Sequence, residues 1–102
     1  MEGHASISTD VLATYAQDAA LEVVGVDGLV ESHLPRSRPV RISVGDDGEV
    51  AVALHVRLDW GASFPDVGRA VQERVAGYLE RMADLRPVKV DVVVAEAGPV
   101  RA

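Results

Sequence analysis

The chain has 102 residues, of which 48% are hydrophobic and 25% charged, a balance typical of one globular domain rather than of a disordered segment. It carries 16 acidic against 10 basic residues, and this net charge of -6 argues against a nucleic-acid-binding protein, because affinity for phosphates comes mainly from Lys and Arg. The absence of Cys excludes disulfides, thiol nucleophiles and cysteine-ligated metal sites.

The first part of the chain is predicted to hold a short extended segment at residues 5–7 and then an amphipathic helix. Ser8 or Thr9 can cap this helix, and Asp10 places a carboxylate near the positive end of the helix dipole. Apolar residues recur at helical spacing on one side: Val11, Leu12, Tyr15, Ala16, Ala19, Ala20, Val23 and Val24. Gly25 then ends the helix, since glycine adopts the left-handed backbone conformation at low cost.

The middle of the chain changes from helical to strand periodicity. Residues 26–30 are predicted to be a half-buried connector, and residues 31–39 an exposed loop because they are rich in Pro, Arg and Ser. Apolar and polar residues then alternate over Val40–Val44 and over Val50–Trp60, with a turn rich in Gly and Asp at residues 45–48 between them. This pattern predicts an antiparallel β-hairpin whose apolar side faces the core.

A second amphipathic helix and a final strand are predicted in the last part of the chain. Ser63, followed by Asp66 three positions later, resembles a capping box, and Pro65 fits the first turn of a helix. The apolar stripe of this helix consists of Phe64, Val67, Val71, Val75, Tyr78, Leu79 and Met82. Residues 88–94 alternate Val with Lys and Asp, which predicts a strand.

The predicted order is therefore strand, helix, strand, strand, helix, strand. Each helix must bury its stripe against the apolar side of one sheet, so the fold class is α+β, a two-layer sandwich with two helices on one face of a small sheet. We expect one domain over residues 1–102, with a core from about residue 5 to residue 95 and a short frayed tail.

The candidate site lies on the side of the sheet that no helix is left to cover. His55, Arg57 and Asp59 share one side of the long strand, and Lys89 and Asp91 can extend this polar patch. One interpretation is a surface that binds a partner protein, and the alternative is a solvated face with cross-strand ion pairs. Small or apolar residues on the same side favour self-association by reducing the cost of covering it: Ala51, Ala53 and Val93.

No set of residues predicts catalysis or a cofactor. An enzyme built on His55 and Asp59 would need a nucleophile that the sequence does not show, and a metal site would need His4 or His33 to join His55. Turn chemistry explains the acidic residues of the hairpin loop without calcium: Asp46, Asp47 and Glu49. The basic cluster is interpreted as a solvated loop: Arg36, Arg38 and Arg41.

Two aromatic residues of the predicted strands and helices are expected in the core. Trp60 and Tyr78 both fall on the apolar registers of their elements, so core packing explains them better than an exposed stacking pair.

The sequence shows no signal for membrane insertion. Its N-terminus lacks the basic and apolar regions of a signal peptide, and no apolar run approaches the ~20 residues that span a bilayer. We therefore expect a cytoplasmic protein that does not insert directly into a membrane.

A set of short segments, in this order along the chain, resembles a known family. They are Ile7–Ser8, Glu22–Leu29, Trp60–Gly61, Val71–Val75 and Val88–Val92. Their order and spacing are similar to those of the bacterial alkaline-shock and glucose-starvation general-stress protein family, and the likeness extends from about Ser6 to Ala95.

This resemblance implies a non-enzymatic protein of the envelope stress response, a scaffold or adaptor that self-associates and is held near the membrane by a separate membrane-anchored protein. The family supplies no catalytic residues and no cofactor. Two segments depart from the expected pattern, Pro35–Pro39 and Ala83–Pro87. An alternative function for the same fold is a module that binds a small ligand or a regulator in a cleft between the sheet and the helices.

Overall fold

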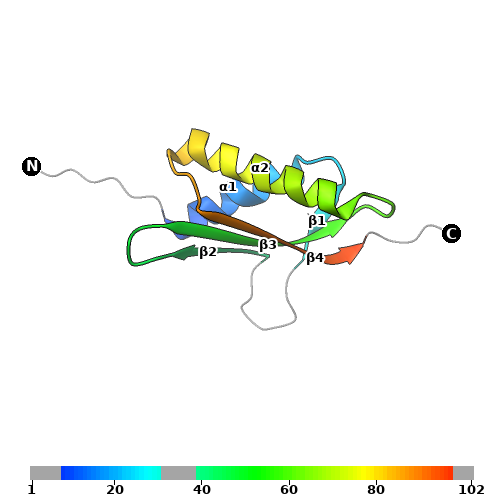
Figure 1. Ribbon diagram of the computed structural model, residues 1–102, viewed down its shortest axis with the longest axis horizontal. Coiled ribbons are helices and arrows are strands. Elements are labelled where there is room, and N and C mark those ends of the chain that lie inside the picture. Colours follow the sequence, from blue (N-terminus) through cyan, green and yellow to red (C-terminus); the bar gives the residue numbers. More distant parts are fainter. Residues whose placement is uncertain (1–7, 31–38, 98–102) are drawn as a thin grey trace, which may run out of the picture.

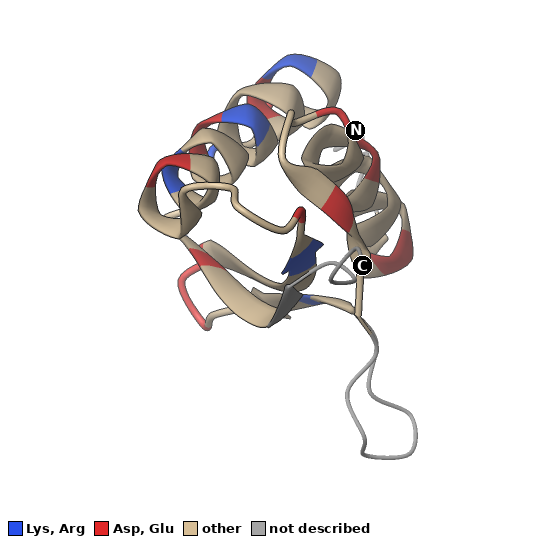
Figure 2. Cartoon of the chain, turned by 90° about the vertical axis from the view of Figure 1, so that its right-hand side faces the viewer, with Lys and Arg blue, Asp and Glu red and all other residues tan. Residues whose placement is uncertain are grey.

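Two helices cover one face of a four-stranded sheet in the computed structural model, which describes residues 8–30 and 39–97 (Figure 1). The elements in chain order are α1 (Thr9–Leu21), β1 (Val26–Leu29), β2 (Val40–Val44), β3 (Val50–Leu58), α2 (Phe64–Ala83) and β4 (Lys89–Ala97). An end-on view shows the helices side by side above the sheet (Figure 2). The predicted two-layer α+β architecture is confirmed, while the extended segment expected at residues 5–7 lies outside the described residues.

β3 is the central strand of the sheet. Its first half pairs antiparallel with β2, which confirms the predicted hairpin, and its second half pairs antiparallel with β1. β1 and β2 follow one another along the same side of β3, since the His55 N–H donates to the Pro39 carbonyl and the His55 carbonyl accepts from the Val30 N–H. β4 lies on the other side of β3 and runs parallel to it.

The segment expected as a connector forms a strand. Val26–Leu29 pairs with the end of β3, with an irregular register between Val26 and Gly28. The sequence of this strand does not alternate, because Asp27 and Gly28 interrupt its apolar residues, and four residues are too few to show a period of two. Tertiary pairing with β3, rather than local propensity, makes this segment extended.

The core lies between the helices and the inner side of the sheet, as the alternation predicts. β3 contributes every second residue to it, all at most 5% exposed: Val50, Val52, Leu54, Val56 and Leu58. The helices contribute Leu12, Ala16, Ala19, Ala20, Val67, Val71, Val75 and Leu79. Burying each Val or Leu side chain contributes roughly 1.5–3 kcal/mol of transfer free energy, so this aliphatic layer is the main force that holds the helices on the sheet.

The helix ends agree with the sequence in part. Ser8 caps α1, with its Oγ accepting a hydrogen bond from the Val11 N–H at 3.2 Å. Gly25 has the expected positive φ, +103°, but the prediction that it ends the helix is wrong, because α1 ends at Leu21 with Glu22 as its C-cap. Ser63 occupies the cap position of α2, but its side chain makes no capping hydrogen bond, so the predicted capping box is wrong.

The aromatic prediction is wrong for Trp60 and only partly right for Tyr78. Trp60 is 65% exposed, because β3 ends at Leu58 and the chain turns at Gly61 with a φ of +88° before the alternation can reach the indole. Tyr78 is half-buried and packs edge-on against Tyr15, with their ring centroids 5.9 Å apart.

Candidate functional site

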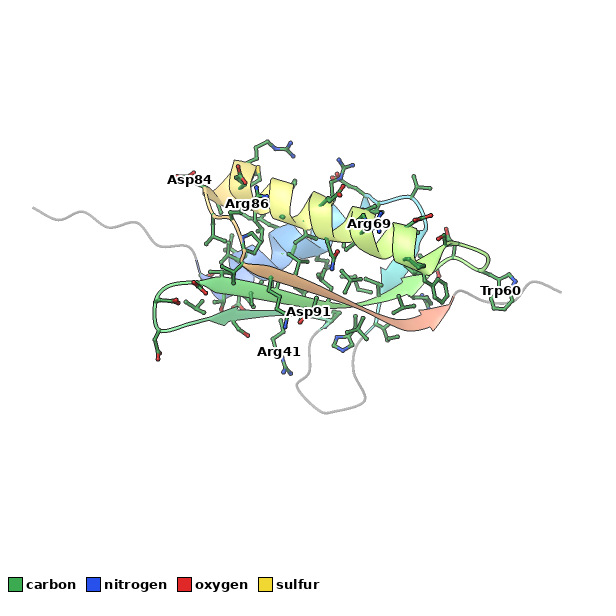
Figure 3. The ribbon with its side chains drawn as sticks, viewed as in Figure 1. Arg41, Trp60, Arg69, Asp84, Arg86 and Asp91 are labelled. Carbon is green, nitrogen blue, oxygen red and sulfur yellow. The ribbon has the colours of Figure 1, made fainter. Side chains whose placement is uncertain are left out.

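The open face of the sheet is the side that α1 and α2 leave uncovered. The β3 side chains that alternate with the core residues are half-buried there: Ala51, Ala53, His55 and Arg57. The strand registers place Ala53 between Arg41 of β2 and Asp91 of β4, and His55 beside Val93. Figure 3 shows Arg41 and Asp91 on the side of the sheet away from the helices. Small β3 side chains therefore line the middle of this face, with longer polar ones on both flanks.

Lys89 and Asp91 form an ion pair on the open face. They stand two residues apart on β4 and so share one side of the strand, with Lys89 Nζ 3.4 Å from Asp91 Oδ2. Both side chains are more than half exposed, so water screens the pair and its contribution to stability is at most ~1 kcal/mol. The expected proximity of these two residues is correct.

Arg57 forms an ion pair with Asp27 of β1. Its Nε lies 2.9 Å from Asp27 Oδ2, but the contact lacks hydrogen-bond geometry and is an ion pair only. The guanidinium also lies against Gly28, where a Cβ atom would stand 3.5 Å from Nη2. Sequence reasoning missed Asp27, because its segment was expected to be a connector and not a strand beside Arg57.

His55 and Asp59 differ in their positions. The backbone of His55 bonds both to Pro39, just before β2, and to Val30, just after β1. Its half-buried side chain makes no hydrogen bond to a described residue. Asp59 lies one residue beyond β3, where its N–H donates to the Gly25 carbonyl at 2.8 Å and its exposed side chain stands at the turn.

The five predicted site residues thus form separate groups rather than one patch. Asp91 pairs in register with Ala53, and Arg57 lies four residues further along β3, which is about 13 Å at ~3.3 Å per residue. Lys89 and Asp91 mark one end of the open face, and Arg57 with Asp27 marks the other. His55 and Val93 lie between these two ion pairs.

The described residues hold no group of three or more His, Asp or Glu side chains that could bind a metal ion. His4 and His33, which a site with His55 would require, lie outside the described residues. In the hairpin loop, Asp47 Oδ1 accepts a hydrogen bond from the Glu49 N–H at 3.1 Å, and Gly48 has a φ of +84°. This is the turn chemistry that the sequence indicates.

Two surface grooves flank α2. The first has a volume of about 510 Å³ and lies between the end of α1 and α2, lined by Glu22, Val23, Val24, Ala70, Glu73, Arg74, Gly77, Tyr78 and Arg81. Arg81 stacks 5.4 Å from the centre of the Tyr78 ring, and Arg74 Nη2 lies 3.4 Å from Glu22 Oε1. The second groove, also about 510 Å³, lies between α2 and the start of β4.

Within residues 8–30 and 39–97, neither helix has the length and hydrophobicity that a bilayer crossing requires.

One comparison with known proteins identifies the family, and another identifies similar folds. A family model for alkaline shock protein 23, described by a cell envelope-related function, matches residues 1–97. A His-to-Ala variant of the MamM CTD has a similar structure, with a TM-score of 0.68 at 19% identity over 90% of this chain and 100% of that chain. A Trp-to-Ala variant of the same domain gives 0.65 at 21% identity over 93% and 86%.

These structural likenesses show the fold alone, and no curated protein matches the sequence. The family match covers nearly the whole chain and agrees with the resemblance carried by the local segments of the sequence. The chain belongs to the alkaline shock protein 23 family, whose function is related to the cell envelope.

Proposed function

We propose that this protein is a non-enzymatic cytoplasmic scaffold or adaptor of the envelope stress response, which binds other proteins through the open face of its sheet. The observation that carries the proposal is the row of half-buried β3 side chains on that face, which no described helix covers. Ala51 and Ala53 let a partner approach the backbone closely, and Val93, 44% exposed, adds apolar surface beside them.

The charges on the open face suit a protein contact. The ion pairs Lys89–Asp91 and Arg57–Asp27 stand at its two ends, with the small and apolar side chains between them. Interfaces commonly combine an apolar centre with a polar rim, in which charges set orientation and association rate more than affinity. The competing interpretation is a face that remains solvated, with its ion pairs exposed to water.

The partner that this function requires is a protein held at the membrane. The family has a cell envelope-related function, while neither described helix can cross a bilayer, so a separate membrane-anchored protein would bring this chain to the membrane. The net charge of -6 favours a partner with a basic contact surface, because opposite charge speeds encounter. Self-association is the second contact that a scaffold needs.

An experiment on the open face tests this proposal. Arg57→Glu reverses one charge of the face, and Arg69→Glu makes the same change on α2, where Figure 3 shows Arg69 on the helical layer. Tagged wild-type protein is expected to recover a membrane protein from gently solubilised cells. The Arg57→Glu variant should recover about tenfold less of it, which corresponds to a loss of ~1.4 kcal/mol in binding free energy. The Arg69→Glu variant should recover the same amount as wild type. Equal recovery with all three proteins would contradict the open-face contact.

A small-ligand module is the second candidate, and the groove between α2 and the turn after α1 is the observation that favours it. Its volume of about 510 Å³ lies within the roughly 300–1,000 Å³ of small-molecule sites. Tyr78 and Arg81 there offer a ring and a cation to a ligand. A metabolite that binds only the folded state would raise the melting temperature, and the rise should disappear in Tyr78→Ala.

A further inference from the structure

The outer side of β4 is a free sheet edge. β4 has nine residues and pairs with β3 on one side, and no described strand pairs with its other side. His55 directs its backbone groups to Pro39 and Val30, so the even-numbered residues of β3 face β4, and a residue of a parallel strand bonds to the two neighbours of its register partner. Val52 of β3, the register partner of Val90, therefore bonds to Lys89 and Asp91, and it is Val90 and Val92 that direct their N–H and C=O groups to the free edge.

The two edges of the sheet differ in how they are protected. The opposite edge is divided into β1 and β2, is irregular between Val26 and Gly28, and has Pro39 before β2. Breaks, bulges and Pro are the features that keep sheet edges from pairing with other chains. β4 has none of them in its first six residues, and its sequence from Val92 to Ala95 is uncharged and rich in Val. It is the edge suited to accept a strand.

The charges of β4 are complementary to those of a second, antiparallel copy of β4. Lys89 and Asp91 lie two residues apart on one side of β4. If a second β4 runs antiparallel with its Asp91 opposite Lys89, two-fold symmetry also places its Lys89 opposite Asp91, so both charges are matched twice. Registers that place Asp91 opposite Asp91, or Lys89 opposite Lys89, bring like charges together.

The groove beside β4 leaves room for the helix that a second copy would bring. This groove is lined on one side by α2, including Gln72, Ala76 and Gly77, and on the other by residues 86–91. A Cβ atom on Gly77 would meet no atom within 4 Å, so the surface of α2 is low and open there. Gln72 Nε2 donates to the Val90 carbonyl at 3.0 Å and holds α2 above the start of β4. Two α2 helices could approach across Ala76 and Gly77 when two β4 strands pair.

We propose that two copies of this chain pair through β4, antiparallel about a two-fold axis at Val90, with Lys89 of each copy opposite Asp91 of the other. The two sheets then form one continuous sheet, and the half-buried Val90 and Val92 become enclosed beneath the two α2 helices. This inference rests on the self-association part of the proposed function and names its surface. It uses Lys89 and Asp91 at one end of the open face and leaves the part around Ala53, His55 and Arg57 for a different partner.

Charge exchange between the strands tests the pairing. Lys89→Asp and Asp91→Lys each place like charges opposite one another in a symmetric pair, so each is expected to weaken the dimer about tenfold or more in sedimentation equilibrium. An equimolar mixture of the two variants brings Asp at both positions opposite Lys at both, so it should form a heterodimer about as tight as the wild-type dimer. The mixture separates the contact between chains from any effect on folding within one chain.

The outcomes separate this pairing from the open-face contact. Arg57→Glu should leave the dimer unchanged while it lowers recovery of the membrane partner. A wild-type protein that stays monomeric at millimolar concentration would overturn the pairing, as would single variants that dimerise like wild type or a mixture that stays monomeric. The sedimentation results do not depend on whether the membrane protein binds the open face.

Discussion

Gly25 lies so close to Val67 that no side chain fits between them. A Cβ atom on Gly25 would stand 2.7 Å from Val67 Cγ2, and the φ of Gly25 is +103°. The carbonyl of Gly25 also accepts the hydrogen bond from the Asp59 N–H. This one residue therefore brings the turn after α1 into β1 and lets α2 pack against that turn.

Gly25→Ala is expected to lower the free energy of unfolding by about 2–4 kcal/mol, since it adds backbone strain at positive φ to overpacking against Val67. Gly48→Ala is the matched control, because Gly48 has a φ of +84° but no atom within 4 Å of an added Cβ. It should cost only the strain, ~1–2 kcal/mol. Urea denaturation measures both, and equal losses would show that contact with Val67 contributes nothing.

The two helix caps should respond differently to the same substitution. Ser8→Ala removes the oxygen that accepts from the Val11 N–H, so it should lower stability by ~0.5–2 kcal/mol. Ser63→Ala removes no capping hydrogen bond and should change stability by less than ~0.5 kcal/mol. Thermal unfolding followed by circular dichroism compares the two variants, and a larger loss for Ser63→Ala would contradict the described caps.

The helices, the hairpin and the core of this fold could be predicted because each has a long periodic signal. The alternation of β3 runs unbroken from Val50 to Leu58, and its buried residues are those that the pattern indicates. β1 could not be predicted, since its four residues include Asp27 and Gly28 and are extended through pairing with β3. The prediction that Trp60 lies in the core was wrong, because alternation does not show where a strand ends.

The candidate site could be predicted only where it depends on one strand. Lys89 and Asp91 share a side because they stand two residues apart, a relationship visible in the sequence. The pairing of Arg57 with Asp27 depends on which strand lies beside β3, and that is a property of the topology. For the same reason, the separation of Arg57 from Asp91 along β3 follows from the register and not from the sequence pattern.

The fluorescence of the single Trp tests the exposed position of Trp60. At 65% exposure, the folded protein should show the red-shifted emission of a solvated indole and be quenched by acrylamide almost as strongly as the unfolded chain. Trp60→Ala should alter stability by less than ~0.5 kcal/mol. Tyr15→Ala, which removes the ring that packs against Tyr78, should cost more. Blue-shifted emission that shifts to the red on unfolding would place Trp60 in the core instead.

The ion pair between Arg57 and Asp27 should contribute little to stability. Their side chains are 39% and 36% exposed, so water and salt screen the two charged groups, and the buried Arg57 Nε adds no hydrogen bond to the 2.9 Å contact. In a double-mutant cycle with Arg57→Ala and Asp27→Ala, we expect a coupling free energy below ~1 kcal/mol that falls further in ~1 M NaCl.

The same cycle on Lys89 and Asp91 provides a comparison, because their Nζ–Oδ2 distance is longer and both side chains are more exposed. Its coupling should be the smaller of the two, since Coulomb energy falls with distance and with the polarity of the surroundings. If the coupling between Arg57 and Asp27 instead exceeded ~2 kcal/mol and resisted salt, the pair would have to be shielded from water. That result would make Arg57 a structural residue that holds β1 against β3 and remove it from the surface that we propose for partner binding.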